Sequence, residues 1–221
     1  YILRELTSPD GGFYCGQDAD SDGVEGKYYL LSRGDAVSVL GEDDGGRFCS
    51  IYNIPDSGMG IPNRIGAPGT EWARDDERLK KLYNFRRERT HLVTDDKILT
   101  SWSSWAIIAL ARAGYALQEK RYTEAALKCH TFIDTFLTSD GVLFHRYRDG
   151  EAAYPGQLDD YAVYSLALTE LYKTSYSPEY LRRAACLARK MTELFQDEGG
   201  GLCMTARDSE KLIMRPKETY D

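Results

Sequence analysis

Positive charge is in short supply in this sequence, and long apolar runs are absent. Its 28 lysines and arginines are outnumbered by 35 aspartates and glutamates, which gives a net charge of −7. This balance leaves no basic surface for nucleic acid or for an anionic membrane, so we expect neither as a partner. The longest apolar run, residues 105–111, is far shorter than the roughly 20 residues of a membrane span. The composition therefore predicts a soluble protein.

Paired cysteines and histidines are also missing. The five cysteines are widely spaced and form no C-x-x-C pattern, which argues against a zinc site or a disulfide framework. Reduced thiols are the simplest interpretation, and they predict a cytoplasmic protein without a bound metal or cofactor. The three histidines, His91, His130 and His145, are far apart. Because His130 falls within an expected helix, we interpret it as a packed or surface residue rather than a catalyst.

The segment from Asp18 to Tyr29 resembles the start of a calcium-binding loop. Its D-x-D-x-D-G opening places oxygen ligands at loop positions 1, 3 and 5 and a turn glycine at position 6. Position 12 needs a bidentate glutamate, but Tyr29 stands there. Flanking glycines and aromatics indicate strand or loop rather than helices. An acidic turn is the favoured interpretation.

Apolar periodicity predicts four helices in the second half of the chain. The stretches 102–113 and 161–172 are apolar nearly all round, as in helices buried on most faces. The stretches that begin at Tyr122 and at Ser177-Pro178 instead carry one apolar stripe each. Further helices are expected from Asp35, near residues 47–52 and over about residues 72–89. Buried and half-buried helices thus alternate along the second half.

This alternation is a repeat with a period of about 58 residues. The offset lays Tyr122 on Tyr180 and Asp140-Gly141 on Glu198-Gly199, so each unit is an inner helix, an outer helix and a glycine-marked hairpin. Stacked helical hairpins form an open solenoid or a closed toroid, and the apolar inner helices favour the toroid. We predict an all-α fold, a partial (α/α) toroid with short β-hairpins between units. Residues 1–221 are expected to form a single fragment of such a toroid domain.

Four motifs carry a resemblance that spans the chain: DGGFYCGQDADSDGVEGKYY, DDKILTSW, PGQLDDYA and GGGLCMTARDSEKLIMRPKETYD. Together they resemble the C-terminal region of the thioredoxin-domain-containing family that includes spermatogenesis-associated protein 20 and the bacterial YyaL proteins. The resemblance implies an (α/α) toroid similar to six-hairpin glycosidases and a longer parent, with a thioredoxin-like domain upstream and further hairpins downstream. The first residue, a tyrosine, and the helix-like YILREL fit such a fragment.

One motif departs from the family pattern. The family usually reads SWNG where this chain reads SWSS, which puts in doubt any role of a side-chain amide at Ser103. The toroid epimerases use paired histidines for proton transfer, and no such pair is evident here. The resemblance therefore implies an architecture more firmly than a reaction.

Carboxylates at the starts of the inner helices are the candidate catalytic groups. In a toroid these starts converge on one mouth, which would gather Asp96 and Lys97 with Asp159 and Asp160. Neighbouring carboxylates repel, so one pKa rises and an acid and a base result, as glycoside hydrolysis or proton abstraction beside a sugar carbonyl requires. The alternative is that these aspartates only cap their helices.

Other residues are candidates for substrate contacts. Sugar sites combine flat rings with polar groups, and Trp102 and Tyr161 adjoin the acidic motifs. Further candidates lie in the first hairpin and near the chain end, where the alternative is a solvated loop: Gln17, Asp18, Asp20, Arg215 and Glu218.

Two classes of function follow. The first is a sugar-binding or carbohydrate-active toroid with Asp96, Asp159 and Asp160 as acid/base groups. The second is a non-catalytic interaction scaffold that accompanies a thioredoxin-like domain. A cut toroid would expose apolar inner-helix surface, so self-association is also expected.

Overall fold

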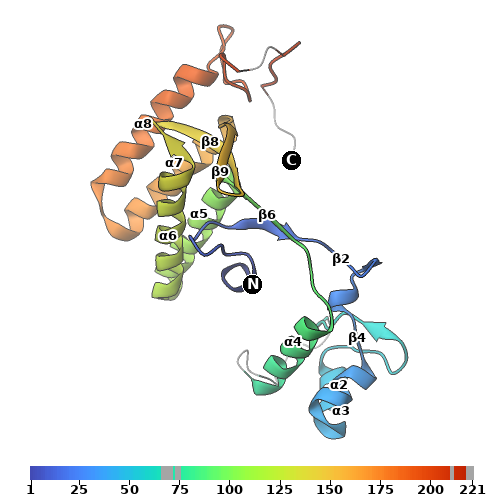
Figure 1. Cartoon of the computed structure of the whole chain (residues 1–221). Helices are drawn as coiled ribbons and strands as arrows, with labels where there is room; N and C mark the ends of the chain where they lie inside the picture. Colours follow the sequence, from blue (N-terminus) through green and yellow to red (C-terminus); the bar gives the residue numbers. More distant parts are fainter. Residues whose placement is uncertain (66–71, 73–75, 210–211, 218–221) are drawn as a thin grey trace. The chain divides into compact units, whose positions relative to one another are not determined.

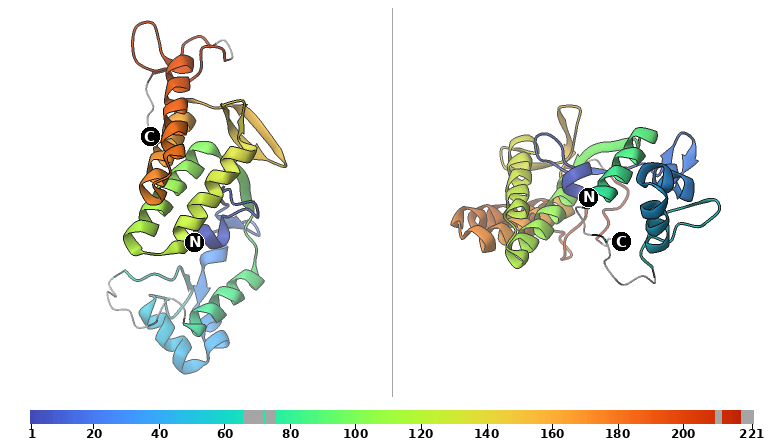
Figure 2. Two further views of the ribbon diagram at one scale, coloured as in Figure 1. Left: turned by 90° about the vertical axis from the view of Figure 1, so that its left-hand side faces the viewer. Right: turned by 90° about the horizontal axis from the view of Figure 1, so that it is seen from below.

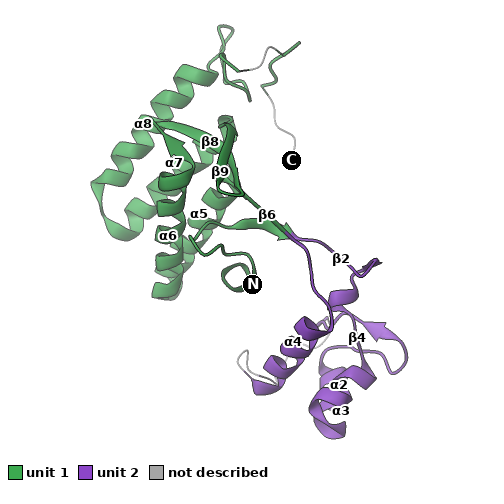
Figure 3. Ribbon diagram, in the orientation of Figure 1, with its two compact units in different colours: residues 1–16, 95–221 green, residues 17–94 purple. Residues whose placement is uncertain are grey.

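The structure, a computed structural model, describes residues 1–65, 72, 76–209 and 212–217. The chain separates into two compact units, shown in Figure 3: unit 1 comprises residues 1–16 and 95–221, and unit 2 comprises residues 17–94. Each unit has its own hydrophobic core. Within the described ranges, no helix combines the length and the apolar character needed to cross a bilayer.

Two helical hairpins form the body of unit 1 (Figures 1 and 2). They consist of α5 (Thr100–Leu117) with α6 (Lys120–Phe136), and α7 (Leu158–Ser175) with α8 (Pro178–Phe195). Helix α5 packs against both α6 and α7, and α7 packs against α8. The second hairpin starts 58 residues after the first, which confirms the repeat predicted from the sequence.

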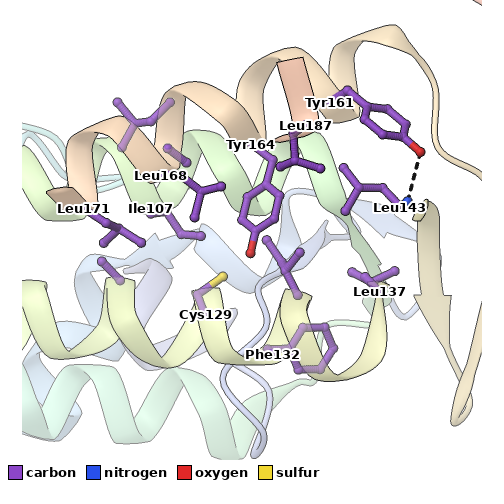
Figure 4. Close-up of a cluster of buried hydrophobic side chains, with 14 of the residues drawn as sticks. Ile107, Cys129, Phe132, Leu137, Leu143, Tyr161, Tyr164, Leu168, Leu171 and Leu187 are labelled. Carbon is purple, nitrogen blue, oxygen red and sulfur yellow. Dashed lines mark hydrogen bonds between the residues drawn. The ribbon is translucent and has the colours of Figure 1, made fainter. Parts of the chain in front are cut away.

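The core of unit 1 lies between these helices (Figure 4). Phe132 on α6 and Tyr164 on α7 are almost wholly buried, and so are Ile107 on α5 and Phe195 on α8. Burying such a side chain contributes roughly 1.5 to 3 kcal/mol, so these four helices stabilise one another chiefly through apolar contact. Tyr164 also places its hydroxyl 2.8 Å from Nδ1 of His130, which is itself buried.

A five-stranded sheet adjoins the starts of α5 and α7, so the all-α class expected from the sequence describes the fold only loosely. The strand order is β1-β6-β8-β7. Strand β9 also pairs with β8, along residues 144–148. The strands are β1 (Tyr14–Gln17), β6 (Thr94–Leu99), β7 (Thr138–Ser139), β8 (Val142–Arg148) and β9 (Glu151–Pro155). The hairpin predicted at Asp140-Gly141 forms as β7-β8. A second hairpin, β8-β9, follows it, and Tyr147 of β8 also pairs with Ile98 of β6. The sheet is formed by short strands from distant parts of the chain. A local sequence pattern does not predict such long-range pairing.

Unit 2 is a small helical unit with two short strand pairs. Its helices are η1 (Lys27–Tyr29), α2 (Arg33–Leu40), α3 (Glu42–Ile51) and α4 (Glu77–Arg89), and its strand pairs are β2 (Asp20–Ser21) with β3 (Val24–Glu25) and β4 (Leu31–Ser32) with β5 (Met59–Gly60). Phe48, Trp72 and Leu82 lie in its core. Helix α4 begins after its N-cap Asp76, whose side chain accepts from the N–H of Arg78. Residues 73–75 of the helix expected over about 72–89 lie outside the described residues.

The acidic segment after Gln17 forms a tight hairpin. Asp22 and Gly23 occupy the turn between β2 and β3 with φ of 52° and 74°, the left-handed backbone that an Asp-Gly two-residue turn supplies. Asp18 Oδ1 accepts from the N–H of Asp20, and Asp22 Oδ2 accepts from Lys27 Nζ and Thr90 Oγ1. Turn geometry and local hydrogen bonds therefore account for the clustering of these carboxylates.

Candidate functional site

The candidate site is built around Asp160, where β9 runs into α7. Gly156 brings the chain so close to Leu143 that a Cβ at this position would lie 2.8 Å from the Leu143 carbonyl oxygen. The chain then turns into α7, and Gln157 and Asp160 cap the helix reciprocally in a capping box. Oδ2 of Asp160 accepts the Gln157 backbone N–H at 2.9 Å. The sequence PGQLDD thus fixes one carboxylate at the start of α7.

Asp160 also joins two other elements. Its Oδ1 accepts the backbone N–H of Ser101, in the first turn of α5, at 3.0 Å, and its Oδ2 lies 2.8 Å from Nδ1 of His145 on β8. The side chain has no solvent exposure. Burial raises the pKa of Asp160, whereas its hydrogen bonds from His145 and from the Gln157 N–H favour the ionised form. One buried carboxylate therefore fixes the starts of both inner helices and the ring of a histidine.

His145 is the functional candidate that the sequence did not single out. Its hydrogen bond with the Asp160 carboxylate raises the pKa of the imidazole above 6.5. An ionised Asp160 requires Nδ1 to carry the proton in this bond, which leaves Nε2 to give or take a proton elsewhere. The side chain is 27% exposed, so the ring is reachable from solvent. A histidine oriented by a buried carboxylate is a recurrent acid/base arrangement in enzymes.

Asp159 stands beside this pair. Its negative charge contributes to the raised pKa of His145. Its Oδ1 is buried, and no hydrogen-bond donor among the described residues reaches it. A buried carboxylate oxygen without a donor is costly, so the described part of the fold does not explain this position of Asp159.

The aromatic candidates divide between surface and core. Trp102 follows Ser101 directly in α5, and 57% of its surface is exposed. Tyr161 has no exposure, packs against Phe195 and accepts the Leu143 N–H at 3.0 Å (Figure 4). Its ring is therefore part of the core and is closed to stacking by a ligand.

Tyr154 is a further aromatic residue at this edge of unit 1. It is 62% exposed and stacks with the Arg146 guanidinium, which lies 5.0 Å from the ring centroid. Its φ of 63° is rare for an aromatic residue. Antiparallel pairing of β8 with β9 places Tyr154 opposite His145. Strained backbone that persists beside a histidine is an observation from which a functional role can be inferred.

Asp96 and Lys97 do not join the group around Asp160. Oδ1 of Asp96 lies 2.7 Å from Nε of Arg148, near the tip of the β8-β9 hairpin, and Lys97 pairs with Asp95. The pairing of Ile98 with Tyr147 and of Leu99 with Arg146 sets this register. Asp96 is four residues before Thr100, which separates the two positions by about 13 Å in an extended strand. Asp96 instead lines a cavity of about 230 Å³ together with Tyr14.

The remaining candidates lie elsewhere. Gln17 ends β1, and Asp18 and Asp20 belong to the hairpin region of unit 2. Arg215 donates through Nε and Nη2 to the Thr205 carbonyl at 3.1 and 2.6 Å, a contact within the terminal loop of unit 1. Glu218 lies outside the described residues. Within the described part of the chain, no three metal-ligating side chains are grouped for a metal ion.

Structural comparison finds several carbohydrate enzymes at low similarity. Cellobiose 2-epimerase from Bacillus thermoamylovorans is 14% identical with a TM-score of 0.45, over 89% of this chain and 53% of that one. A D-mannose isomerase is 14% identical with a TM-score of 0.42, over 87% and 48%. A GH76 alpha-mannanase from Bacteroides thetaiotaomicron is 19% identical with a TM-score of 0.43, over 48% and 30%.

Sequence comparison gives a firmer relationship. No protein-family model matches the chain. An uncharacterized protein of Caenorhabditis elegans is 28% identical over 265 residues, covering 99% of this chain and 36% of that protein. Spermatogenesis-associated protein 20 of rat is 27% identical over 277 residues, covering 100% and 35%, and the human protein is 24% identical over 273 residues. The chain spans about a third of the length of these relatives. The relationship indicated by the sequence motifs is thus confirmed: along its whole length the chain is related to spermatogenesis-associated protein 20.

Proposed function

We propose that unit 1 binds a sugar and that His145, oriented by Asp160, performs acid/base chemistry on it. The observation that carries this proposal is the 2.8 Å contact between His145 Nδ1 and the fully buried Asp160 carboxylate. The buried partner fixes the ring, and the 27% exposure of the side chain would allow Nε2 to reach a substrate. Nε2 would accept a proton from a sugar hydroxyl or an acidic C–H, or return one, at a pH near neutrality.

Asp159 and Trp102 would supply the binding contacts. The half-buried carboxylate of Asp159 would accept a hydrogen bond from a sugar hydroxyl, next to His145. Trp102 presents an exposed ring one residue after Ser101, whose N–H binds Asp160. The C–H face of a pyranose packs well against such a ring. Carboxylate, imidazole and indole would thus contact different sides of one sugar.

The assignment of roles differs from the one that the sequence suggested. Asp160 is buried and occupied by three donors, so we assign it a positioning role rather than direct proton transfer. Asp96, paired with Arg148, would belong to a neighbouring subsite at most. We also propose that the two helical hairpins are part of an (α/α) toroid whose inner helices are α5 and α7. Their starts meet at Asp160, as a toroid mouth requires.

A saccharide panel tests the proposal. Ligand-observed NMR on the full chain, with mono- and disaccharides, is expected to detect at least one sugar that binds the wild type. His145→Gln and Asp159→Asn should each weaken that binding roughly tenfold, because each removes a hydrogen bond involving a charged group. Asp140→Asn makes the same carboxylate-to-amide change at an exposed turn and should bind as the wild type does. No sugar binding, or equal weakening in all three variants, would overturn the proposal.

A non-catalytic interface is the second candidate, favoured by an exposed apolar face on α5 and α7. Trp102 and Trp105 are 57% and 55% exposed, and Leu166 is 40% exposed. Large apolar side chains exposed on neighbouring helices are typical of contact surfaces. We propose a second copy of this chain as its occupant. Sedimentation velocity should then show a concentration-dependent dimer that Trp105→Gln disrupts, and a monomer at high concentration would contradict it.

A further inference from the structure

A second cavity lies at the opposite ends of the two inner helices. It has a volume of about 340 Å³ and lies between the last turns of α5 and α7, where Arg112 and Tyr115 face Glu170 and Tyr172. Arg112 follows Ser101 by 11 residues, which separates them by about 16 Å along the helix axis. The cavity is therefore distinct from the site around His145. Its volume is within the range of small-molecule sites, which begins at roughly 300 Å³.

Glu170 organises the charges of this cavity. Its side chain is only 6% exposed, and Oε1 accepts from Arg112 Nη2 at 2.9 Å and from Lys173 Nζ at 2.8 Å. Arg112 and Lys173 hold the pKa of Glu170 well below its usual range, at about 2, so the carboxylate stays ionised. The two cations are themselves 61% and 63% exposed. The buried Glu170 carboxylate thus holds two exposed cationic side chains side by side, and the three groups together carry a net charge of +1.

Three tyrosine rings complete the lining. Tyr115 and Tyr176 are 65% and 74% exposed, and the ring of Tyr172 lies edge-on to Tyr176 with 6.4 Å between centroids. Tyr176 ends α7 with a φ of 57°, a left-handed conformation that glycine or asparagine normally supplies at this position. The end of α5 has the same left-handed C-cap at Gln118, so this backbone belongs to the helix ends. The ion pair between the helices does not require the open rings, and these are explained if the cavity holds a ligand with a flat face.

We propose that this cavity binds a small anion of monosaccharide size, with a phosphate or carboxylate group on Arg112 and Lys173 and a sugar ring on the tyrosines. Arg112 is suited to this role because a guanidinium offers several N–H donors in one plane and Glu170 takes one of them. The Lys173 ammonium offers a second charge from the neighbouring helix. This proposal is independent of the chemistry proposed for His145.

Calorimetric titration of the full chain with glucose 6-phosphate, glucose and inorganic phosphate tests this site. Glucose 6-phosphate should bind, and glucose and phosphate should each bind more weakly because each engages only the rings or only the cations. Arg112→Gln and Lys173→Gln should weaken binding roughly tenfold or more. Arg121→Gln is the matched control, because Arg121 is also 61% exposed and paired with a glutamate but does not line the cavity.

Two further variants separate the possible outcomes. Tyr176→Asn removes a ring at a position where asparagine tolerates the backbone, so the variant should fold and yet bind glucose 6-phosphate more weakly. His91→Gln, at an exposed position outside both sites, should leave this binding unchanged. Absence of glucose 6-phosphate binding, or equal affinity in the Arg112 and Arg121 variants, would overturn the proposal. Inorganic phosphate that binds as tightly as glucose 6-phosphate would contradict the role of the rings.

Discussion

His145 Nδ1 lies 2.8 Å from Oδ2 of Asp160, across 15 residues of sequence. The contact links strand β8 to the first turn of α7, and through the Ser101 N–H it extends to α5. The Asp160 carboxylate therefore stabilises the starts of α5 and α7 and also orients the ring of His145. A substitution in this pair would therefore affect both the stability of unit 1 and the chemistry proposed for His145.

The pair predicts a loss of stability as pH rises. The folded-state pKa of His145 is raised above 6.5, so its stabilising effect is fully present below the unfolded-state pKa and is lost as pH rises through the folded-state value. The free energy of unfolding, measured with urea, should therefore fall as the pH rises above about 6.5. His145→Gln should flatten this part of the profile, whereas His91→Gln, at an exposed position, should not. An unchanged profile in the His145 variant would contradict the contact.

His130 predicts the opposite dependence at acid pH. The ring of His130, on α6, is buried beside Tyr164, and this burial lowers its pKa from 6.5 to about 4. The folded state therefore favours the neutral ring, and stability is lost as pH falls below 6.5 toward 4. The full effect is about 3 kcal/mol at 1.36 kcal/mol per pKa unit. Urea unfolding of His130→Gln should be less sensitive to acid than that of the wild type, and equal sensitivity would count against this burial.

Asp160→Asn should destabilise unit 1 strongly. The amide has one acceptor oxygen where the carboxylate has two, so at least one of the Ser101 and Gln157 N–H groups would lose its partner in a buried site. The cost should be about 3 kcal/mol or more. Thermal and urea unfolding measure it, with Asp140→Asn at an exposed turn as the control. A cost below about 0.5 kcal/mol would show that the carboxylate does not fix the two helix starts.

Two adjacent serines of α5 predict opposite outcomes. Ser103 is fully buried, and no hydrogen-bond partner among the described residues reaches its hydroxyl. Ser104 is equally buried but donates to the Thr100 carbonyl at 2.6 Å. Ser103→Ala should therefore be neutral or stabilising, whereas Ser104→Ala should cost about 1 kcal/mol. A larger cost at Ser103 than at Ser104, measured by urea unfolding, would contradict these environments.

Periodicity and turn chemistry were enough to predict the helical repeat. The two inner helices and their outer partners occur where the apolar patterns place them, and the Asp140-Gly141 hairpin turn has the left-handed backbone expected of that pair. These features depend on residues close together in the chain. The sheet could not be predicted in the same way, because the pairing of Ile98 with Tyr147 joins segments about fifty residues apart.

The candidate site shows the same division. Asp159 and Asp160 stand out in the sequence because they occupy the first turn of an apolar helix. His145 did not stand out, since its partner is brought near only by the fold. Alternation along β8 places His145 on the same face of the strand as Leu143 and Tyr147, which belong to or pack against the core. This pattern predicts the direction of the His145 side chain but not its partner. Tyr161 was proposed as a ligand platform because it adjoins acidic residues, but its ring is fully buried in the core.

The most direct test of the proposed site is an NMR titration of the three histidine rings with and without the sugar found in the panel. The C–H signals of His91, His130 and His145 can be assigned from single glutamine variants. We predict that the sugar shifts the His145 signal and changes its pKa, while the signals of His91 and His130 stay in place. Sugar binding that leaves the His145 signal and its pKa unchanged would contradict the central claim that this histidine faces the substrate.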